Sequence, residues 1–206
     1  MLTRDWQERL ERALRLDHPY LPGRAPKTLT YTGTGVSRGG VLIPFAGRDP
    51  HILLTLRSET VETHKGQVAF PGGRWDPEDG EDLARTACRE TQEEVGIPTE
   101  RVRVIGALPT LQTVTSGFTV HPFVGMLDGE PRDVELSNQV HEIARSFWIS
   151  WNELMDPSRF EIEKLRLGNV LVPTPVFHWD GLRIWGATGA MIANLRDRVA
   201  RVEAGE

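Results

Sequence analysis

The stretch CRETQEEVGI, Cys88–Ile97, places three glutamates within five residues, at Glu90, Glu93 and Glu94. Like charges four residues apart on a helix destabilise it by roughly 0.2–0.5 kcal/mol. Near the end of a helix, carboxylates also oppose the helix dipole. The crowding therefore indicates either a solvated helix face or a site in which a cation lies between the carboxylates.

The same segment has the boundaries of a helix. Asp79 is a favourable N-cap, and Asp82, three residues later, resembles the second member of a capping box. Gly96 stands where a left-handed residue ends a helix, and Pro98 prevents the helix from continuing. The sequence therefore predicts a helix of about four turns between these signals.

Helical periodicity separates the faces of this segment. At roughly 100° per residue, one face should pack on a sheet, and it holds Ala84, Cys88, Thr91 and Val95. Glu90 and Glu94 are neighbours on the flank, and Glu93 lies about 60° beyond Glu90. Oxygen ligands from adjacent turns suit a hard cation such as Mg²⁺ or Mn²⁺, whereas zinc is usually bound by His or Cys.

A glycine turn precedes the acidic helix. Pro71, Gly72 and Gly73 directly follow a short strand predicted at Gln67–Phe70. Glycines in such a turn either simply end a strand or let backbone N–H groups approach an anion closely. Next to an acidic helix, the second reading sets phosphate-binding amides beside a divalent cation.

The composition fits a globular protein with no nucleic-acid or membrane partner. The 206 residues are 39% hydrophobic and 26% charged, and no apolar run approaches the ~18 residues that cross a membrane. The net charge is −5, and the segment Asp76–Glu94, with eight acids and two arginines, accounts for it. The N-terminus has no secretory signal, and the single Cys88 fits a reducing compartment, so we expect a cytoplasmic protein.

Strand and helix signals are mixed along the chain, which predicts an α/β or α+β domain. An amphipathic helix is expected over residues 5–16 and a Pro- and Gly-rich arm over residues 17–33. Strands are expected at residues 39–47, 51–58, 67–70, 101–111, 118–127 and 144–150, with a further strand and a helix over residues 190–202 near the end.

The acidic segment resembles the Nudix hydrolases, whose motif is G-x5-E-x7-R-E-U-x-E-E-x-G-U with U apolar. Eight residues fill this motif: Gly73, Glu81, Arg89, Glu90, Glu93, Glu94, Gly96 and Ile97. The loop from Gly73 to Glu81 is two residues longer than in the motif, and Thr91 takes a slot usually held by an aliphatic residue. Neither departure removes a charged member.

A second resemblance covers LLTLRSETVETHKGQVAFPGG, Leu53–Gly73, which is similar to the signature of the coenzyme A pyrophosphatase branch of this family. SGFTVHPFVG and IWGATGAMI look like the same branch, so that the resemblance spans about residues 38–195. At Val61 and Glu62 the branch usually has Leu-Arg, and a positive charge that would contact phosphate is missing there.

The resemblance implies an α/β/α sandwich with a mixed β-sheet, in which residues 1–33 form an N-terminal helix and arm and residues 34–206 form the Nudix domain. It implies hydrolysis of coenzyme A with Mg²⁺ or Mn²⁺, giving 4′-phosphopantetheine and adenosine 3′,5′-bisphosphate. Two alternatives stay open. The enzyme would act on another nucleoside diphosphate derivative, such as ADP-ribose, NADH or a dinucleotide, or the chain would be a catalytically silent nucleotide-binding module.

The motif assigns roles within the helix. Glu90 and Glu94 are the expected metal ligands, and Glu93 would hold a second ion or accept a proton from the attacking water. Arg89 would orient these glutamates by charge-assisted hydrogen bonds, or else form an ordinary surface ion pair.

Further candidates lie outside the helix. Arg57, Gly72 and Gly73 are expected to bind substrate phosphates, with a structural ion pair as the alternative for Arg57. Glu142 precedes a predicted strand, where some Nudix enzymes place a general base. Trp6 and the terminal helices would supply the contact of a homodimer.

Overall fold

The computed structural model describes residues 2–17, 37–60, 64–113, 118–167 and 170–206. Nearly all of the predicted arm lies outside these ranges, as do Val61 and Glu62. None of the helices in the described ranges is long and apolar enough to cross a membrane.

An eight-stranded sheet forms the centre of the protein, with strands β1 (Arg38–Ala46), β2 (His51–Arg57), β3 (Val68–Ala69), β4 (Gly72–Arg74), β5 (Val102–Ala107), β6 (Leu111–Gln112), β7 (Thr119–Leu127) and β8 (Ile143–Ser150). The main order is β3-β2-β1-β7-β5, while β4 pairs with β1, β6 with β7 and β8 with β2. Strands β1 and β7 are parallel and the other pairs are antiparallel. The expected mixed sheet is therefore confirmed.

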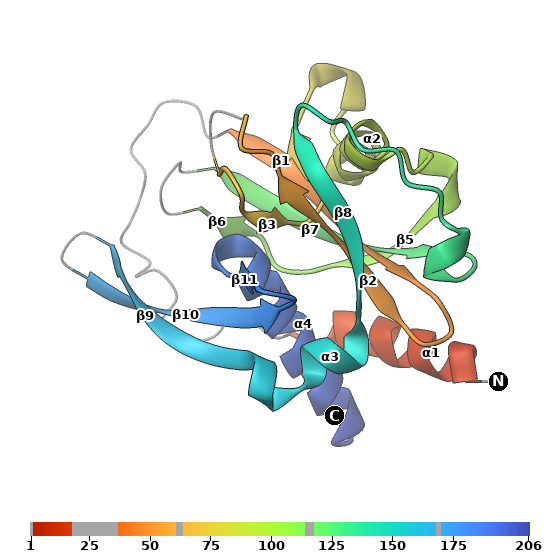
Figure 1. Cartoon of the computed structure of the whole chain (residues 1–206). Coiled ribbons are helices and arrows are strands. Elements are labelled where there is room, and N and C mark those ends of the chain that lie inside the picture. The colour runs from red at the N-terminus through yellow and green to blue at the C-terminus, as the bar shows by residue number, and fades with distance from the viewer. Residues whose placement is uncertain (1, 18–36, 61–63, 114–117, 168–169) are drawn as a thin grey trace.

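Helices cover both faces of this sheet (Figure 1). α2 (Leu83–Val95) lies on one face, and α1 (Leu2–Arg15) and α4 (Gly186–Glu203) lie on the other. Successive side chains of β2 point to opposite faces of the sheet, which explains the arrangement. Ile52 and Leu54 pack in the hydrophobic cluster that includes residues of α1 and α4. Leu53, between them, packs in the cluster that includes Val95 of α2. The α/β/α sandwich is confirmed.

The first and last helices lie against each other (Figure 1). Arg198 of α4 is 3% exposed and donates hydrogen bonds to the carbonyl oxygens of Ala13 and Leu16, at 3.2 and 2.5 Å. The Ala13 carbonyl also accepts the N–H of Leu16 at 3.3 Å, and Leu16 is the first residue after α1, so Arg198 binds both carbonyls where the helix ends. Trp6 of α1 is half-buried and packs against the core, with its ring 4.9 Å from that of Phe45. The homodimer contact expected at Trp6 stays a prediction.

A second, three-stranded antiparallel sheet projects from the body beside α4 (Figure 1), although the sequence patterns assigned no element to most of it. It contains β9 (Phe160–Leu167), β10 (Val170–Trp179) and β11 (Leu182–Ile184) and follows the short helix α3 (Trp151–Met155). Pro173 and Pro175 lie within β10, and because proline cannot donate to a ladder it argues against a strand.

The boundaries of two helices differ from the expectation. The N-cap of α2 is Asp82, whose side chain accepts the N–H of Ala84 at 3.0 Å, so the prediction that Asp79 caps this helix was wrong. Asp79 ends a preceding 3₁₀ turn, Pro77–Asp79. Gly96 ends α2 in the left-handed conformation, as expected. α4 begins at Gly186, four residues before the predicted start at residue 190.

The buried face of α2 also differs in part from the prediction. Thr91 and Val95 are buried as expected, whereas Ala84 and Cys88 are only half-buried. Thr86, Ala87 and Glu94 take the remaining buried positions, together with Leu83 at the first turn. The helix is therefore rotated so that one of the glutamates points into the protein.

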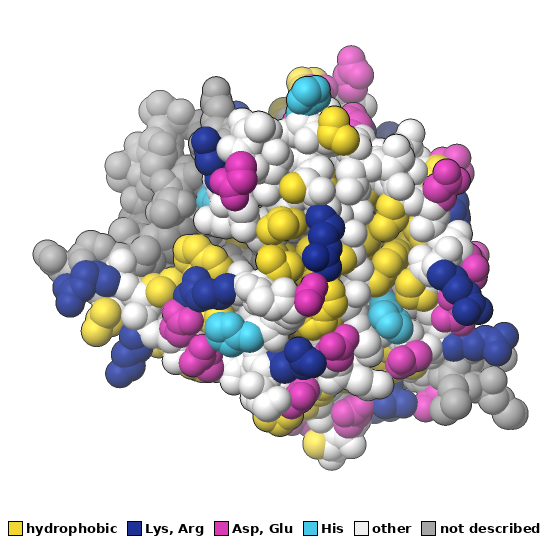
Figure 2. Space-filling view, in the orientation of Figure 1, with side chains coloured by type: hydrophobic (Ala, Val, Ile, Leu, Met, Phe, Trp, Pro, Cys, Tyr) yellow, Lys and Arg dark blue, Asp and Glu magenta, His cyan; other side chains and the backbone are white. Residues whose placement is uncertain are grey.

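The charges on one face of the protein are mixed. Figure 2 shows Asp and Glu side chains lying among Lys and Arg side chains, without a large area of one sign. Among the described residues, this face has no extended basic surface of the kind that binds nucleic acid.

Candidate functional site

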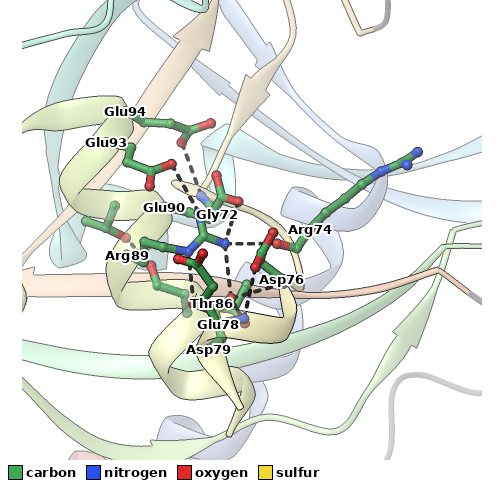
Figure 3. A network of polar contacts seen from close by, with 12 residues as sticks. Gly72, Arg74, Asp76, Glu78, Asp79, Thr86, Arg89, Glu90, Glu93 and Glu94 are labelled. Carbon is green, nitrogen blue, oxygen red and sulfur yellow. Dashed lines mark hydrogen bonds and ion pairs between the residues drawn. The ribbon is translucent and has the colours of Figure 1, made fainter. Parts of the chain in front are cut away.

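Glu94 and Glu90 of α2 lie against Gly72 and Gly73 (Figure 3). The prediction that these glycines form a turn was wrong, because both belong to strand β4, which pairs with β1. Glu94 is 3% exposed, and its Oε2 accepts the backbone N–H of Gly72 at 3.1 Å. The side chain of Glu90 is 18% exposed and that of Glu93 is 55% exposed. Glu94 and Glu90 are thus withdrawn from solvent, which a merely solvated helix face would not require.

Gly73 makes room for Glu90. A Cβ atom added at Gly73 would lie 2.4 Å from the carboxyl carbon of Glu90, so any larger residue would push this carboxylate away. The neighbouring Gly72 has φ of 151°, which L-amino acids rarely adopt. Both glycines therefore position glutamates, and their expected contact with substrate phosphate stays a prediction.

Burial makes the charged forms of Glu90 and Glu94 less stable than they would be in water. Burial raises the pKa of Glu94 to about 7, and the N–H of Gly72 and the charge of Arg57 only partly oppose this. Burial also raises the pKa of Glu90, against the opposing effect of Arg89. Two desolvated carboxylates one turn apart form an oxygen donor set that fits a hard divalent cation.

Arg89 is the centre of a polar network (Figure 3). Its guanidinium lies 3.1 Å from carboxylate oxygens of both Glu90 and Glu93, and it donates to the carbonyl oxygen of Arg74 at 3.1 Å. Its Nε and Nη2 donate to the two carboxylate oxygens of Asp79, at 2.9 and 3.0 Å. One arginine thus fixes two of the three glutamates against a buried anchor.

That anchor is Asp79, not the Glu81 of the motif alignment. Asp79 is 5% exposed and also accepts the hydroxyl of Thr86 at 2.8 Å. The side chain of Glu81 is 90% exposed and lies 3.3 Å from Arg38. A signal was present in the sequence, because the motif spacing counted forward from Gly73 without an insertion reaches Asp79. The two extra residues therefore follow the acid instead of preceding it.

We expect Asp79→Asn to lower the free energy of unfolding by about 2–3 kcal/mol at pH 7, because it breaks a buried charge-assisted pair. The hydrogen bonds from Arg89 lower the pKa of Asp79 from 3.8 to about 2. A depressed carboxyl pKa stabilises the fold above about pH 4, and this stabilisation is lost as the pH falls towards 2. Urea unfolding of both proteins should therefore show the difference shrinking at low pH.

The matched control is Glu81→Gln, which removes an exposed carboxylate two residues away. We expect this variant to change the stability by less than about 0.5 kcal/mol. If Glu81→Gln were the more damaging substitution, the assignment of Asp79 as the anchor would be wrong.

The two remaining candidates from outside the helix, Arg57 and Glu142, lie near the same carboxylates. Arg57, at the end of β2, places its Nη1 3.8 Å from Glu94 Oε1. Its Nε is buried and has no hydrogen-bond partner among the described residues. Glu142, in the turn before β8, lies close enough for its charge to raise the pKa of both Glu90 and Glu94. The structure thus brings together all of the predicted site residues, namely Arg57, Gly72, Gly73, Arg89, Glu90, Glu93, Glu94 and Glu142.

Comparison with known proteins agrees with this arrangement. The family model described as the NUDIX domain matches residues 34–167. A protein of Yersinia enterocolitica named "Uncharacterized Nudix hydrolase NudL" is 39% identical over 160 residues, which cover 77% of this chain and 80% of the relative. The protein of the same name from Yersinia pestis is 36% identical over 164 residues, which cover 79% of this chain and 80% of the relative.

A solved structure shares the fold. The crystal structure of a MutT/nudix family protein from Enterococcus faecalis superimposes with a TM-score of 0.52 at 14% identity, covering 82% of this chain and 64% of that one. The matched domain, the relatives and the carboxylate site lead to one conclusion. The chain belongs to the Nudix hydrolases and is a pyrophosphatase-type hydrolase of nucleoside diphosphate derivatives.

Proposed function

We propose that this enzyme hydrolyses the pyrophosphate bond of coenzyme A or its derivatives, giving 4′-phosphopantetheine, or its acyl form, and adenosine 3′,5′-bisphosphate. The observation that carries the proposal is the position of Arg57. This residue belongs to the Leu53–Gly73 segment that resembles the coenzyme A pyrophosphatase branch, and it lies against Glu94. The segment that marks the branch therefore borders the carboxylate site.

The donor set fits Mg²⁺ or Mn²⁺. Glu90 and Glu94 would hold the cation, and the more exposed Glu93 would complete its ligands or hold a second one. When bound, the cation neutralises diphosphate charge and lowers the pKa of a water molecule. Arg89 keeps Glu90 and Glu93 in place through the pairs described above, so that they are oriented before the substrate arrives.

The remaining residues act on the substrate and the water. Arg57 has an unpartnered Nε and would donate to diphosphate oxygens. Glu142 would accept the proton of the attacking water, with Glu93 as the second candidate base. The water oxygen forms a bond to one phosphorus, the bond from this phosphorus to the bridging oxygen breaks, and the second phosphate leaves.

Coenzyme A carries a 3′-phosphate in addition to its diphosphate, so the enzyme needs a positively charged residue that binds this third phosphate. The slot that usually holds Arg contains Glu62. Arg57 is already committed to the carboxylate site, whereas Arg74 is exposed and extends away from the glutamates (Figure 3). Arg74, together with Lys65 nearby in the sequence, is therefore our candidate for the 3′-phosphate.

We expect coenzyme A to be cleaved with a higher kcat/KM than its 3′-dephospho form, by a modest factor. A charge-assisted contact is worth about 1.5–3 kcal/mol when well made, and an exposed one is worth about 1 kcal/mol or less. The measurement is kcat/KM for both compounds, with ADP-ribose and NADH alongside and the products identified by mass spectrometry. The variant Arg74→Gln should narrow the difference between the two coenzyme A forms.

A clearly better turnover of ADP-ribose or NADH would refute the coenzyme A proposal. The broader conclusion, hydrolysis of a nucleoside diphosphate derivative, would be untouched by that result. Absence of turnover for every compound would instead favour a nucleotide-binding role.

A further inference from the structure

We infer that Ser58 and Thr60 are positioning residues that hold the turn carrying Glu142 beside the metal-ligand glutamates. The inference rests on the proposed role of Glu142 as the base. The segment that follows β2 contains the buried Ser58 directly after Arg57, and the exposed Thr60 two residues later. This segment contacts residues more than eighty positions further along the chain.

The hydroxyl groups of Ser58 and Thr60 form a directed chain. Thr60 Oγ1 donates to the carbonyl oxygen of His141 at 2.9 Å. Because a carbonyl only accepts, the Thr60 proton is used there, and Ser58 Oγ donates to Thr60 Oγ1 at 2.7 Å. Ser58 Oγ in turn accepts the backbone N–H of Thr60 at 3.2 Å. Each bond in such a chain polarises the next, which favours a single geometry.

The turn that carries Glu142 is bonded from two sides. The backbone N–H of Ser58 donates to the carbonyl oxygen of Glu142 at 2.8 Å, and the hydroxyl chain reaches the preceding His141. On the other side, the N–H of Gln139 donates to the carbonyl oxygen of Glu94 at 2.9 Å. The N–H of Glu142 in turn donates to the carbonyl oxygen of Gln139, also at 2.9 Å. The base candidate is therefore fixed to the end of α2 as well as to the end of β2.

Loss of the Thr60 hydroxyl should disturb this turn without unfolding the protein. Thr60 is exposed, so water can replace the lost donor to the His141 carbonyl. Water does not tie His141 to Ser58, however, and the turn keeps only its backbone bonds. A small displacement of Glu142 would lower the rate of proton transfer while Arg57, which binds the substrate, stays in place.

The test is Thr60→Val, which keeps the shape of the side chain and removes the hydroxyl. Since a misplacement of about 1 Å costs up to a hundredfold in rate, we expect kcat to fall by about tenfold, with KM within about twofold and an unchanged Tm. Thr60→Ser is the matched control, because it keeps the donor and should retain kcat. Equal losses in both variants, or no loss in Thr60→Val, would overturn the inference.

A double-mutant cycle separates positioning from a general structural effect. If Thr60 acts through Glu142, Thr60→Val should add no further loss of kcat in a Glu142→Gln background. Additive losses, or full activity of Glu142→Gln alone, would show that Thr60 does not act through Glu142.

A measurement that needs no substrate tests the positioning role of Thr60 independently of the proposed function. Backbone hydrogen exchange over residues 139–143 should be faster in Thr60→Val than in the wild type and in Thr60→Ser. Unchanged exchange would contradict the inference, even if coenzyme A is the substrate. Faster exchange would support it, even if the wild-type enzyme prefers another nucleotide.

Discussion

Replacing Glu94 with glutamine is expected to lower kcat by at least about a hundredfold, comparable to the loss of a key electrostatic group in other enzymes. Glutamine keeps the shape of the side chain and still accepts the N–H of Gly72, which lies 3.1 Å from Glu94 Oε2. It offers the cation only a neutral oxygen, however. The substitution therefore separates the charge at this position from its packing.

The same substitution should make the metal-free protein equally or more stable. Burial raises the pKa of Glu94 from 4.5 to about 7. When folding raises the pKa of a carboxyl group, the folded protein loses stability as the pH increases from about 4.5 to about 7, because only the folded state holds the proton in this range. Above pH 7 we expect the free energy of unfolding of Glu94→Gln to be higher than that of the wild type by on the order of 1–3 kcal/mol. The measurement is urea unfolding in the presence of a chelator.

The two measurements together give a clear outcome. A stable variant with near-normal turnover would show that Glu94 contributes no charge to catalysis. A variant that is less stable than the wild type at pH 8 would contradict the desolvation argument instead. Glu81→Gln serves as the control for loss of one negative charge, because Glu81 lies exposed before the same helix.

Removal of divalent cations should abolish turnover completely and reversibly. The carboxylates of Glu90 and Glu94 are withdrawn from water and repel each other, and substrate phosphate would add further negative charge. We expect no activity in excess EDTA and recovery on addition of Mg²⁺ or Mn²⁺. Turnover that persists in the chelator would refute the proposed site.

Cation binding should also depend on pH. Because burial raises the pKa of Glu94 to about 7, a cation held by this residue below pH 7 would have to displace a proton. Titration calorimetry with Mn²⁺ should therefore show weaker binding at pH 6 than at pH 8, with proton release at pH 6 detected by comparing buffers of different ionisation enthalpy. Equal affinity at the two pH values would show that Glu94 is not the group that loses a proton when the cation binds.

The spacing of charged residues made most of the site predictable. Glu90 and Glu94 are four residues apart, so any helix brings them together, and the adjacent glycines Gly72 and Gly73 indicate the backbone that lies against them. Asp79 was missed as the partner of Arg89 because the motif spacing fits Asp79 when counted forward from Gly73 and Glu81 when counted back from Arg89. The structure distinguishes the two, since Asp79 is buried and Glu81 is exposed.

Long-range pairing was less predictable than local patterns. The strand β10 contains Pro173 and Pro175 in the part that pairs with β9, whereas β11 pairs with residues 177–179. Prolines are tolerated there because that part of β10 has a neighbouring strand on one side. The hydroxyl chain from Ser58 to His141 likewise depends on segments that are far apart in the sequence. Contacts of this kind come from the tertiary fold, which single-residue propensities do not describe.

The pairing of α1 with α4 has a consequence for the order of folding during synthesis. Arg198 reaches the carbonyls of Ala13 and Leu16 across more than 180 residues. Ribosomes add about 5–20 residues per second, so α1 emerges many seconds before the arginine that caps it. During this interval its apolar face, including Leu10, lacks the α4 surface on which it finally packs. A nascent chain stalled before α4 should therefore expose α1 to chaperones and proteases, and release of the last helix should end that exposure.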